Sequence, residues 1–336
     1  MNFNNIHNVH NIVIAPHRDD AFLTFGGTIL NALENRERVT IYVIYGTDGY
    51  LREEFKNGIK KGDKFIYSYL EKNRRIAGFP AFSNDLFSLI KNAKTSLDWA
   101  KIGIIIRKLE ERAACKTLGI RLKEYNLPSA FPLRGYKSFN SKKSSIFDND
   151  ISIQLSLLAG SERYINKDVI EKLRGILKSF STFYYCRRIS LVRDLIKEIK
   201  TPRIKYKFYF PAGIGGHPDH IILAKFAYIF SRIAKKKGTV SIYLGQDIPY
   251  SVVLEWVNFS PFKLYNLEKI IISIERNLEK KIQLLKGFYY SQFSVRDVYI
   301  IKKYHKFSAE LINNKYYKSK YSNKKPKAVE ILYKIL

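Results

Sequence analysis

The start of the chain alternates between strand-like and helix-like patterns, and this alternation restricts the fold more than any other feature. Residues 12–15 form a short β-branched run that Pro16 closes, as expected of a buried parallel strand that ends at a loop. Apolar residues then recur at helical spacing over residues 21–33, and residues 39–45 form a second strand-like run. Such a β-α-β opening predicts an α/β fold with an open, mostly parallel sheet.

Later segments continue this alternation. Residues 204–210 and 240–244 are strand-like runs, and a helical pattern at residues 221–230 lies between them. Three further helices are predicted from apolar residues three and four apart, at residues 99–118, 168–199 and 270–285. Gly119 is a suitable end for the first of these.

The predicted organisation is one domain over residues 1–300 followed by a tail. Residues from about 50 to 98 show no clear strand character and are expected to be an insertion that forms a lid or a side module. Residues 301–336 are rich in Lys and Tyr and are expected to be a basic, solvated C-terminal extension. Three isolated histidines are expected at the surface: His7, His10 and His305.

The composition is that of a globular protein, because hydrophobic residues make up 46% of the chain and can supply a core. The N-terminus does not resemble a signal peptide, and no stretch reaches the roughly 18 consecutive apolar residues of a membrane span. A cytoplasmic protein without a membrane span is therefore expected. Cys115 and Cys186 lack a paired spacing and are expected to be buried free thiols.

The net charge of +29 would suit a nucleic-acid partner. However, the lysines are spread through the whole chain among many Ile, Asn and Tyr residues, as a biased genome composition would produce. We therefore expect no specific nucleic-acid partner, and interpret the charge as favouring an anionic substrate or an anionic surface near it.

Two clusters of His and Asp directly follow predicted strands, at residues 17–20 and 217–220. Open α/β sheets bind their ligands outside the carboxyl ends of the strands. A catalytic zinc site uses three His or carboxylate ligands and leaves one position for water. We expect His17, Asp20 and His220 to hold one Zn²⁺ per chain, although another divalent metal would also suit these ligands.

The other polar residues of the two clusters are candidates for acid-base chemistry. Asp19 cannot easily point the same way as Asp20, and we expect it to be the general base that accepts the proton of a metal-bound water. His217, oriented by a carboxylate such as Asp219, is expected to stabilise the tetrahedral oxyanion and to protonate the departing amine.

These motifs resemble those of the LmbE-like, or PIG-L-type, zinc de-N-acetylases. The family's His-Pro-Asp-Asp signature is similar to residues 17–20, with Arg18 in place of the proline, and its His-x-Asp-His motif is similar to residues 217–220. Further motifs fall in the family's order: Gly26-Gly27, Arg107 to Glu111, Leu118-Gly119, Leu127 to Ala130 with Arg134, Gly213 to Gly216, Asp247 to Tyr250 and Tyr290 to Gln292. The resemblance covers residues 10–293.

The resemblance implies a Rossmann-like α/β fold with helices on both faces of the sheet. It also implies a zinc hydrolase that removes the acetyl group of an N-acetylglucosamine conjugate by attack of a metal-bound water on the amide carbonyl. The implied metal ligands, general base and acidic histidine fall on the same residues as above. Arg107 is implied to bind the substrate, with a helix-surface salt bridge to Glu111 as the alternative, and Arg18 would contact an anionic substrate or depress the pKa of the base.

Other functions explain less of the sequence. A dinucleotide-binding oxidoreductase is disfavoured, because no G-x-G-x-x-G follows the first strand. A non-catalytic, basic nucleic-acid-binding protein is the alternative from a different class, but it explains none of the His and Asp clustering. A zinc hydrolase that acts on a different amide is a further alternative. The sequence does not indicate an oligomeric state.

Overall fold

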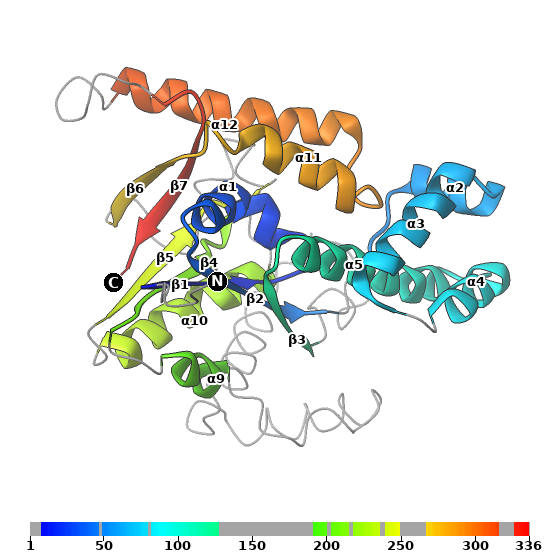
Figure 1. Ribbon diagram of the computed structural model, residues 1–336, viewed down its shortest axis with the longest axis horizontal. Coiled ribbons are helices and arrows are strands. Elements are labelled where there is room, and N and C mark those ends of the chain that lie inside the picture. The colour runs from blue at the N-terminus through cyan, green and yellow to red at the C-terminus, as the bar shows by residue number, and fades with distance from the viewer. Residues whose placement is uncertain are drawn as a thin grey trace, which may run out of the picture.

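A seven-stranded sheet forms the centre of the molecule in the computed structural model (Figure 1). The residues described are 8–46, 49–79, 82–127, 191–199, 203–214, 218–235, 239–248, 267–315 and 326–335. In sheet order the strands are β3 (Arg121–Leu127), β2 (Arg38–Tyr45), β1 (Val9–Ala15), β4 (Lys205–Pro211), β5 (Val240–Gly245), β7 (Val329–Lys334) and β6 (Glu268–Ser273). Neighbours from β3 to β5 are parallel, whereas β7 is antiparallel to both β5 and β6.

Helices cover both faces of this sheet (Figure 1). On one face lie α1 (Asp20–Glu34), α11 (Leu278–Phe288), α12 (Val295–Lys315) and the end of α5 (Ser96–Thr117). On the other lie α9 (Leu191–Glu198) and α10 (Pro218–Ala234). Because side chains alternate along a strand, Val13 packs into the first core and its neighbour Ile12 into the second. The predicted α/β class, with a mostly parallel sheet between two helical layers, is confirmed.

The predicted insertion is a helical module at one end of the sheet, at the right in Figure 1. It consists of α2 (Glu53–Lys61), α3 (Lys64–Ala77) and α4 (Phe82–Asn92), which pack with α5. Phe55, Leu70 and Ile106 belong to its separate apolar core. Gly62 ends α2 in the left-handed conformation, and the Asp63 carboxylate then caps the start of α3.

Two secondary-structure predictions differ from the structure. The spacing of apolar residues predicts one helix over residues 270–285, but β6 occupies Glu268–Ser273 and α11 begins only at Leu278. The isoleucines at 270–272 suit a strand as well as a helix, and pairing with β7 decides between the two. Strand β3 was missed because its sequence, RLKEYNL, is largely polar. Of the helix predicted at 168–199, only α9 lies within the described residues.

The C-terminal residues are part of the sheet. Val329–Lys334 forms β7, and this strand lies between β5 and β6. A solvated extension is therefore the wrong description of this strand, because Leu332 and its neighbours are buried. The predicted domain boundary at residue 300 stays a prediction.

His10 and His305 were expected at the surface and are buried instead, whereas Cys115 is buried as predicted. His10 lies in β1 and contacts the hydroxyl of Thr40 at 2.9 Å. His7 and Cys186 lie outside the described residues. Within those residues, no helix combines the length and the hydropathy that crossing a membrane would require.

A buried ion pair joins the C-terminal elements to α1. Lys281 of α11 donates from Nζ to Glu330 of β7 at 2.9 Å, to Nε2 of His305 at 2.9 Å and to the backbone oxygen of Leu23 at 2.6 Å. Glu330 in turn accepts from the backbone N–H of Gly27 at 2.8 Å. Burial and the charge of Lys281 lower the pKa of His305 to about 3, so its neutral ring acts as an acceptor. The three N–H groups of Lys281 thus have three acceptors.

Candidate metal centre

The topology of the sheet brings the two His and Asp clusters together. Strands β1 and β4 are parallel neighbours, yet β1 connects through α1 to β2 on its other side. The carboxyl ends of β1 and β4 therefore form a topological switch point, where open α/β sheets bind ligands. His17 follows β1 and Asp20 begins α1, while His220 lies in the first turn of α10, just after β4.

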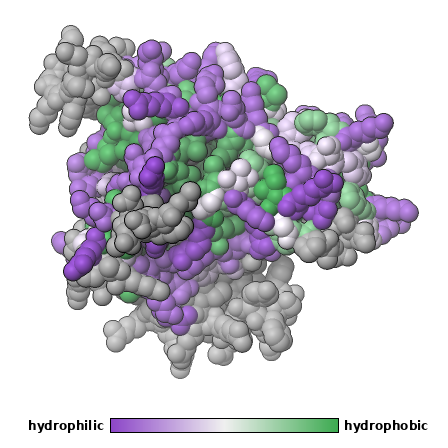
Figure 2. Space-filling view, in the orientation of Figure 1, coloured by the Kyte–Doolittle hydropathy of each residue, from purple (hydrophilic) through white to green (hydrophobic). Residues whose placement is uncertain are grey.

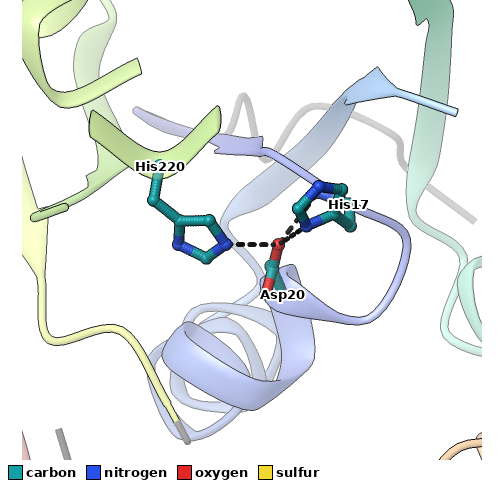
Figure 3. Close-up of side chains that lie close together, drawn as sticks. All are labelled: His17, Asp20 and His220. Atoms are coloured by element: carbon teal, nitrogen blue, oxygen red, sulfur yellow. Dashed lines mark hydrogen bonds and ion pairs between the residues drawn. The ribbon is translucent and has the colours of Figure 1, made fainter. Parts of the chain in front are cut away.

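Three side chains converge at this point: His17, Asp20 and His220 (Figure 3). The Asp20 Oδ2 atom lies 3.1 Å from Nδ1 of His17 and 3.3 Å from Nε2 of His220. Their potential ligand atoms all lie within 4.8 Å of one another, and the three residues are buried. The predicted ligand set is therefore brought together in space, from two segments about 200 residues apart in the sequence.

The second nitrogen of each imidazole faces a carboxylate. His17 Nε2 lies 3.0 Å from Oδ2 of Asp219, and His220 Nδ1 lies 2.9 Å from Oδ1 of Asp247. The other oxygen of Asp247 accepts from the backbone N–H of Ile214 at 2.7 Å. Such outer carboxylates fix the tautomer and direct the remaining nitrogen toward a metal. Two imidazoles and one carboxylate form a donor set that zinc accepts, so the residues fit a divalent cation.

The electrostatics of the site also suit a cation. Burial lowers the pKa of His220, but the charges of Asp20 and Asp247 outweigh this effect and raise the pKa to about 10. For Asp20, burial raises the pKa, but the two histidines lower it well below its usual value. Buried carboxylates thus create a negative potential around His220, which a bound divalent ion would neutralise.

Asp19 lies beside the three ligands at the edge of solvent and contacts Arg107 of α5. The Arg107 guanidinium donates to Oδ1 of Asp19 at 2.5 Å. The side chain of Arg107 is 3% exposed, compared with 14% for that of Asp19. Arg107 therefore reaches into the site, and its contact with Asp19 replaces the helix-surface salt bridge to Glu111 that was the alternative. Substrate binding by Arg107 stays a prediction.

Arg18 points from the same loop toward β3. Its guanidinium forms an ion pair with Glu124, which also accepts from Arg112 of α5. The side chain of Arg18 is 2% exposed, so this ion pair is buried. The structure therefore gives Arg18 a role in holding the loop after β1 against β3, and a contact with substrate stays a prediction.

Two carboxylates of α5, those of Glu110 and Glu111, are fully buried. Glu110 accepts from the hydroxyls of Tyr69 at 2.5 Å and Ser291 at 2.7 Å, and Glu111 accepts from the hydroxyl of Tyr289 at 2.5 Å. Burial raises the pKa of Glu110 to about 7 and that of Glu111 to about 8. These contacts connect the helical module to the segment after α11.

The sequence does not indicate that Asp247 belongs to the site, and it predicts a different partner for Asp219 from the one that the structure shows. Asp247 follows β5 within one of the motifs of the resemblance, but the sequence alone indicates no role for it. Asp219 was expected to orient His217, and the structure places its carboxylate against His17. His217 lies outside the described residues, so its predicted role as acid stays a prediction.

Comparison with known families identifies the chain. The sequence model described as PIG-L, GlcNAc-PI de-N-acetylase, matches residues 12–230, and this range contains His17, Asp20 and His220. The chain belongs to the PIG-L family. Comparison with curated proteins finds no match.

Solved structures that resemble this PIG-L protein in fold include a deacetylase and a hydratase. A zinc-inhibited form of teicoplanin deacetylase has a TM-score of 0.51 at 14% identity, with 97% of each chain covered. A deacetylase-teicoplanin complex has a TM-score of 0.50 at 15% identity, covering 97% of this chain and 98% of that one. The 4-carboxy-2-hydroxymuconate hydratase of Pseudomonas putida has a TM-score of 0.50 at 12% identity, covering 98% and 96%. At these identities the likeness establishes the fold alone.

Proposed function

We propose that this PIG-L protein is a zinc-dependent hydrolase that removes the acetyl group from an N-acetylated sugar conjugate. The observation that carries the proposal is the convergence of His17, Asp20 and His220 on one point at the switch of the sheet. Membership of a family described as de-N-acetylases supports the reaction. The net charge of +29 supports an anionic conjugate.

The metal would be held by Nδ1 of His17, a carboxylate oxygen of Asp20 and Nε2 of His220. When bound, zinc supplies a Lewis acid that polarises the amide carbonyl and lowers the pKa of water to roughly 7. Asp219 and Asp247 hold the two imidazoles in the orientation that this requires.

Asp19 would accept the proton of the attacking water, because it is the carboxylate next to the ligands that is partly exposed. Arg107 holds this carboxylate in one position through a charge-assisted hydrogen bond. His217 would donate a proton to the nitrogen of the departing amine. The C–N bond then breaks, and the products are acetate and the free amino sugar.

The proposal is tested by measuring zinc content and acetate release on the same preparation. N-acetylglucosamine conjugates with lipid, nucleotide and thiol carriers would be screened for released acetate. We expect about one zinc per chain and acetate from at least one conjugate. His220→Ala should lose both, whereas His10→Gln, which alters a buried histidine outside the site, should keep both.

Two results would contradict the proposal. If His220→Ala retained its zinc, the ligand set would be wrong. If the zinc-loaded protein released acetate from none of the sugars but from another N-acyl substrate, the second candidate, a zinc hydrolase of a different amide, would replace it.

A further inference from the structure

The outward face of α12 carries a concentration of exposed apolar side chains. Among the described residues, eight large hydrophobic side chains are exposed, and five of them lie on this helix: Val295, Tyr299, Ile300, Phe307 and Leu311. Figure 1 shows α12 as the outermost labelled helix on its side of the sheet. The inward face of α12 is already occupied, because Val298, Ile301 and Ile312 pack into the protein core.

Three of these residues form a continuous stripe. Ile300, Phe307 and Leu311 are separated by seven and four positions, which places them on one side of a helix. Their exposed fractions are 37%, 43% and 48%. Tyr304 lies between them at the same spacing and is partly buried, with its hydroxyl bonded to Gln246. The stripe therefore runs along about three turns of the helix.

Basic side chains border the stripe. Arg296, Lys303 and Lys306 are exposed, and the ammonium of Lys303 lies 4.8 Å from the ring centre of Tyr299. The acidic residues on this helix are Asp297, which caps the helix start through Ser294, and Glu310. Over its whole length α12 has five basic and two acidic residues. Hydrophilic residues cover most of the face shown in Figure 2, with hydrophobic residues between them.

We propose that the outward face of α12 docks the protein on an anionic lipid surface. An apolar stripe with a basic border is the arrangement by which a helix lies in the plane of a membrane interface. The apolar side chains enter the boundary of the acyl chains, while the lysines and Arg296 remain among the negatively charged headgroups. Because α12 is held by its inward face, the whole protein would be docked peripherally.

Charge and hydrophobicity together favour an anionic lipid surface over a second copy of the chain or a nucleic acid. A second copy of the chain would bring a net charge of +29 against the same charge, which opposes self-association through this face. A nucleic acid would satisfy the lysines, but its backbone offers no partner for Ile300 and Leu311. An anionic lipid surface satisfies both the cations and the apolar stripe.

The test is sedimentation of the full chain with vesicles. Neutral phosphatidylcholine vesicles are compared with vesicles containing about one third phosphatidylglycerol, at low and high salt. We expect binding to the anionic vesicles only, and weaker binding at high salt. A variant with Ile300→Gln, Phe307→Gln and Leu311→Gln should bind at least about tenfold more weakly.

A second variant tests the basic border separately from the apolar stripe. Lys303→Glu with Lys306→Glu should weaken binding by at least about fivefold for each lysine. The matched charge control is Lys61→Glu with Lys64→Glu, at exposed positions of the helical module. The matched apolar control is Ile233→Gln on α10, where the side chain is 41% exposed. Both controls should bind like the unaltered chain, and thermal unfolding should verify that all variants are folded.

Several outcomes would overturn the proposal. One is equal binding to neutral vesicles, and another is unchanged binding of the apolar variant. Binding of DNA or RNA without binding of anionic vesicles would assign the face to nucleic acid. A dimer that dissociates in the apolar variant, again without vesicle binding, would assign it to a second copy of the chain.

Discussion

The guanidinium of Arg107 lies 2.5 Å from the carboxylate of Asp19, although 88 residues separate them in the sequence. Arg107 belongs to α5, which packs against the helical module, whereas Asp19 precedes α1 beside the candidate metal ligands. The helix that packs against the module therefore contributes a contact to the site itself. A carboxylate that is held by a buried cation has a restricted orientation, which a general base needs.

Loss of Arg107 should reduce kcat more than it raises KM. In Arg107→Met, Asp19 loses its ion pair with Arg107, and we expect kcat to fall by about 10². Arg107→Lys, which keeps the charge but not the planar fork, should recover part of the activity. Steady-state kinetics and zinc content would be measured together. A rise in KM with kcat unchanged would instead assign Arg107 to substrate binding.

Asp247 should control metal affinity through His220. In Asp247→Asn the imidazole loses its carboxylate partner, and we expect zinc affinity to fall by about 10- to 100-fold. Competition with a chelator of known affinity would measure this change. Asp194→Asn is the matched control, because Asp194 accepts from Tyr125 away from the site. Equal affinities in the two variants would exclude Asp247 from the metal centre.

Breaking the ion pair between Lys281 and Glu330 should destabilise the fold. In Lys281→Met the Glu330 carboxylate stays buried without its cation, and we expect a loss of about 3–5 kcal/mol in the free energy of unfolding. Replacing both residues, as Lys281→Met with Glu330→Gln, should restore part of the loss. Urea unfolding of both variants would measure these changes. A single variant as stable as the unaltered chain would show that the pair contributes little.

Glu111 should make the protein less stable as the pH rises. Burial raises its pKa to about 8 in the folded state, well above the value of about 4.3 that an unfolded chain would have. The folded state therefore holds a proton that the unfolded state releases, so stability is complete below pH ~4.3 and falls until pH ~8. Glu111→Gln should remove this part of the decline while keeping an acceptor for Tyr289. Parallel slopes of unfolding free energy against pH for the two proteins would contradict the assignment.

Much of the fold could be predicted from the sequence, because β1, β2, β4 and β5 are buried strands whose β-branched and aromatic runs are distinctive. The convergence of the candidate metal ligands could be predicted for a related reason, since both clusters follow such strands. Strand β3 could not, because an edge strand has fewer buried positions and its sequence is correspondingly polar. Strand β6 was mistaken for a helix, since short apolar runs fit both periods.

Contacts between residues that lie far apart in the chain also could not be predicted from the sequence. Nothing local to Asp247 indicates that it meets His220, because that contact needs the order of β4 and β5 in the sheet. His305 lies in a basic segment that is typical of a surface, and only the packing of α12 against β7 buries it. The tertiary packing therefore determines both the contact of Asp247 and the burial of His305.

The position of β7 between β5 and β6 means that the sheet can be completed only after residues 329–334 have been synthesised. Within the described part of the chain, β6 has β7 as its sheet neighbour, so it has no strand to pair with until residues 329–334 have left the ribosome. The same segment carries Glu330, whose carboxylate forms the buried ion pair with the ammonium of Lys281 beside α1. Nascent chains that stall before this point would expose an unpaired strand edge, which is a common starting point for aggregation.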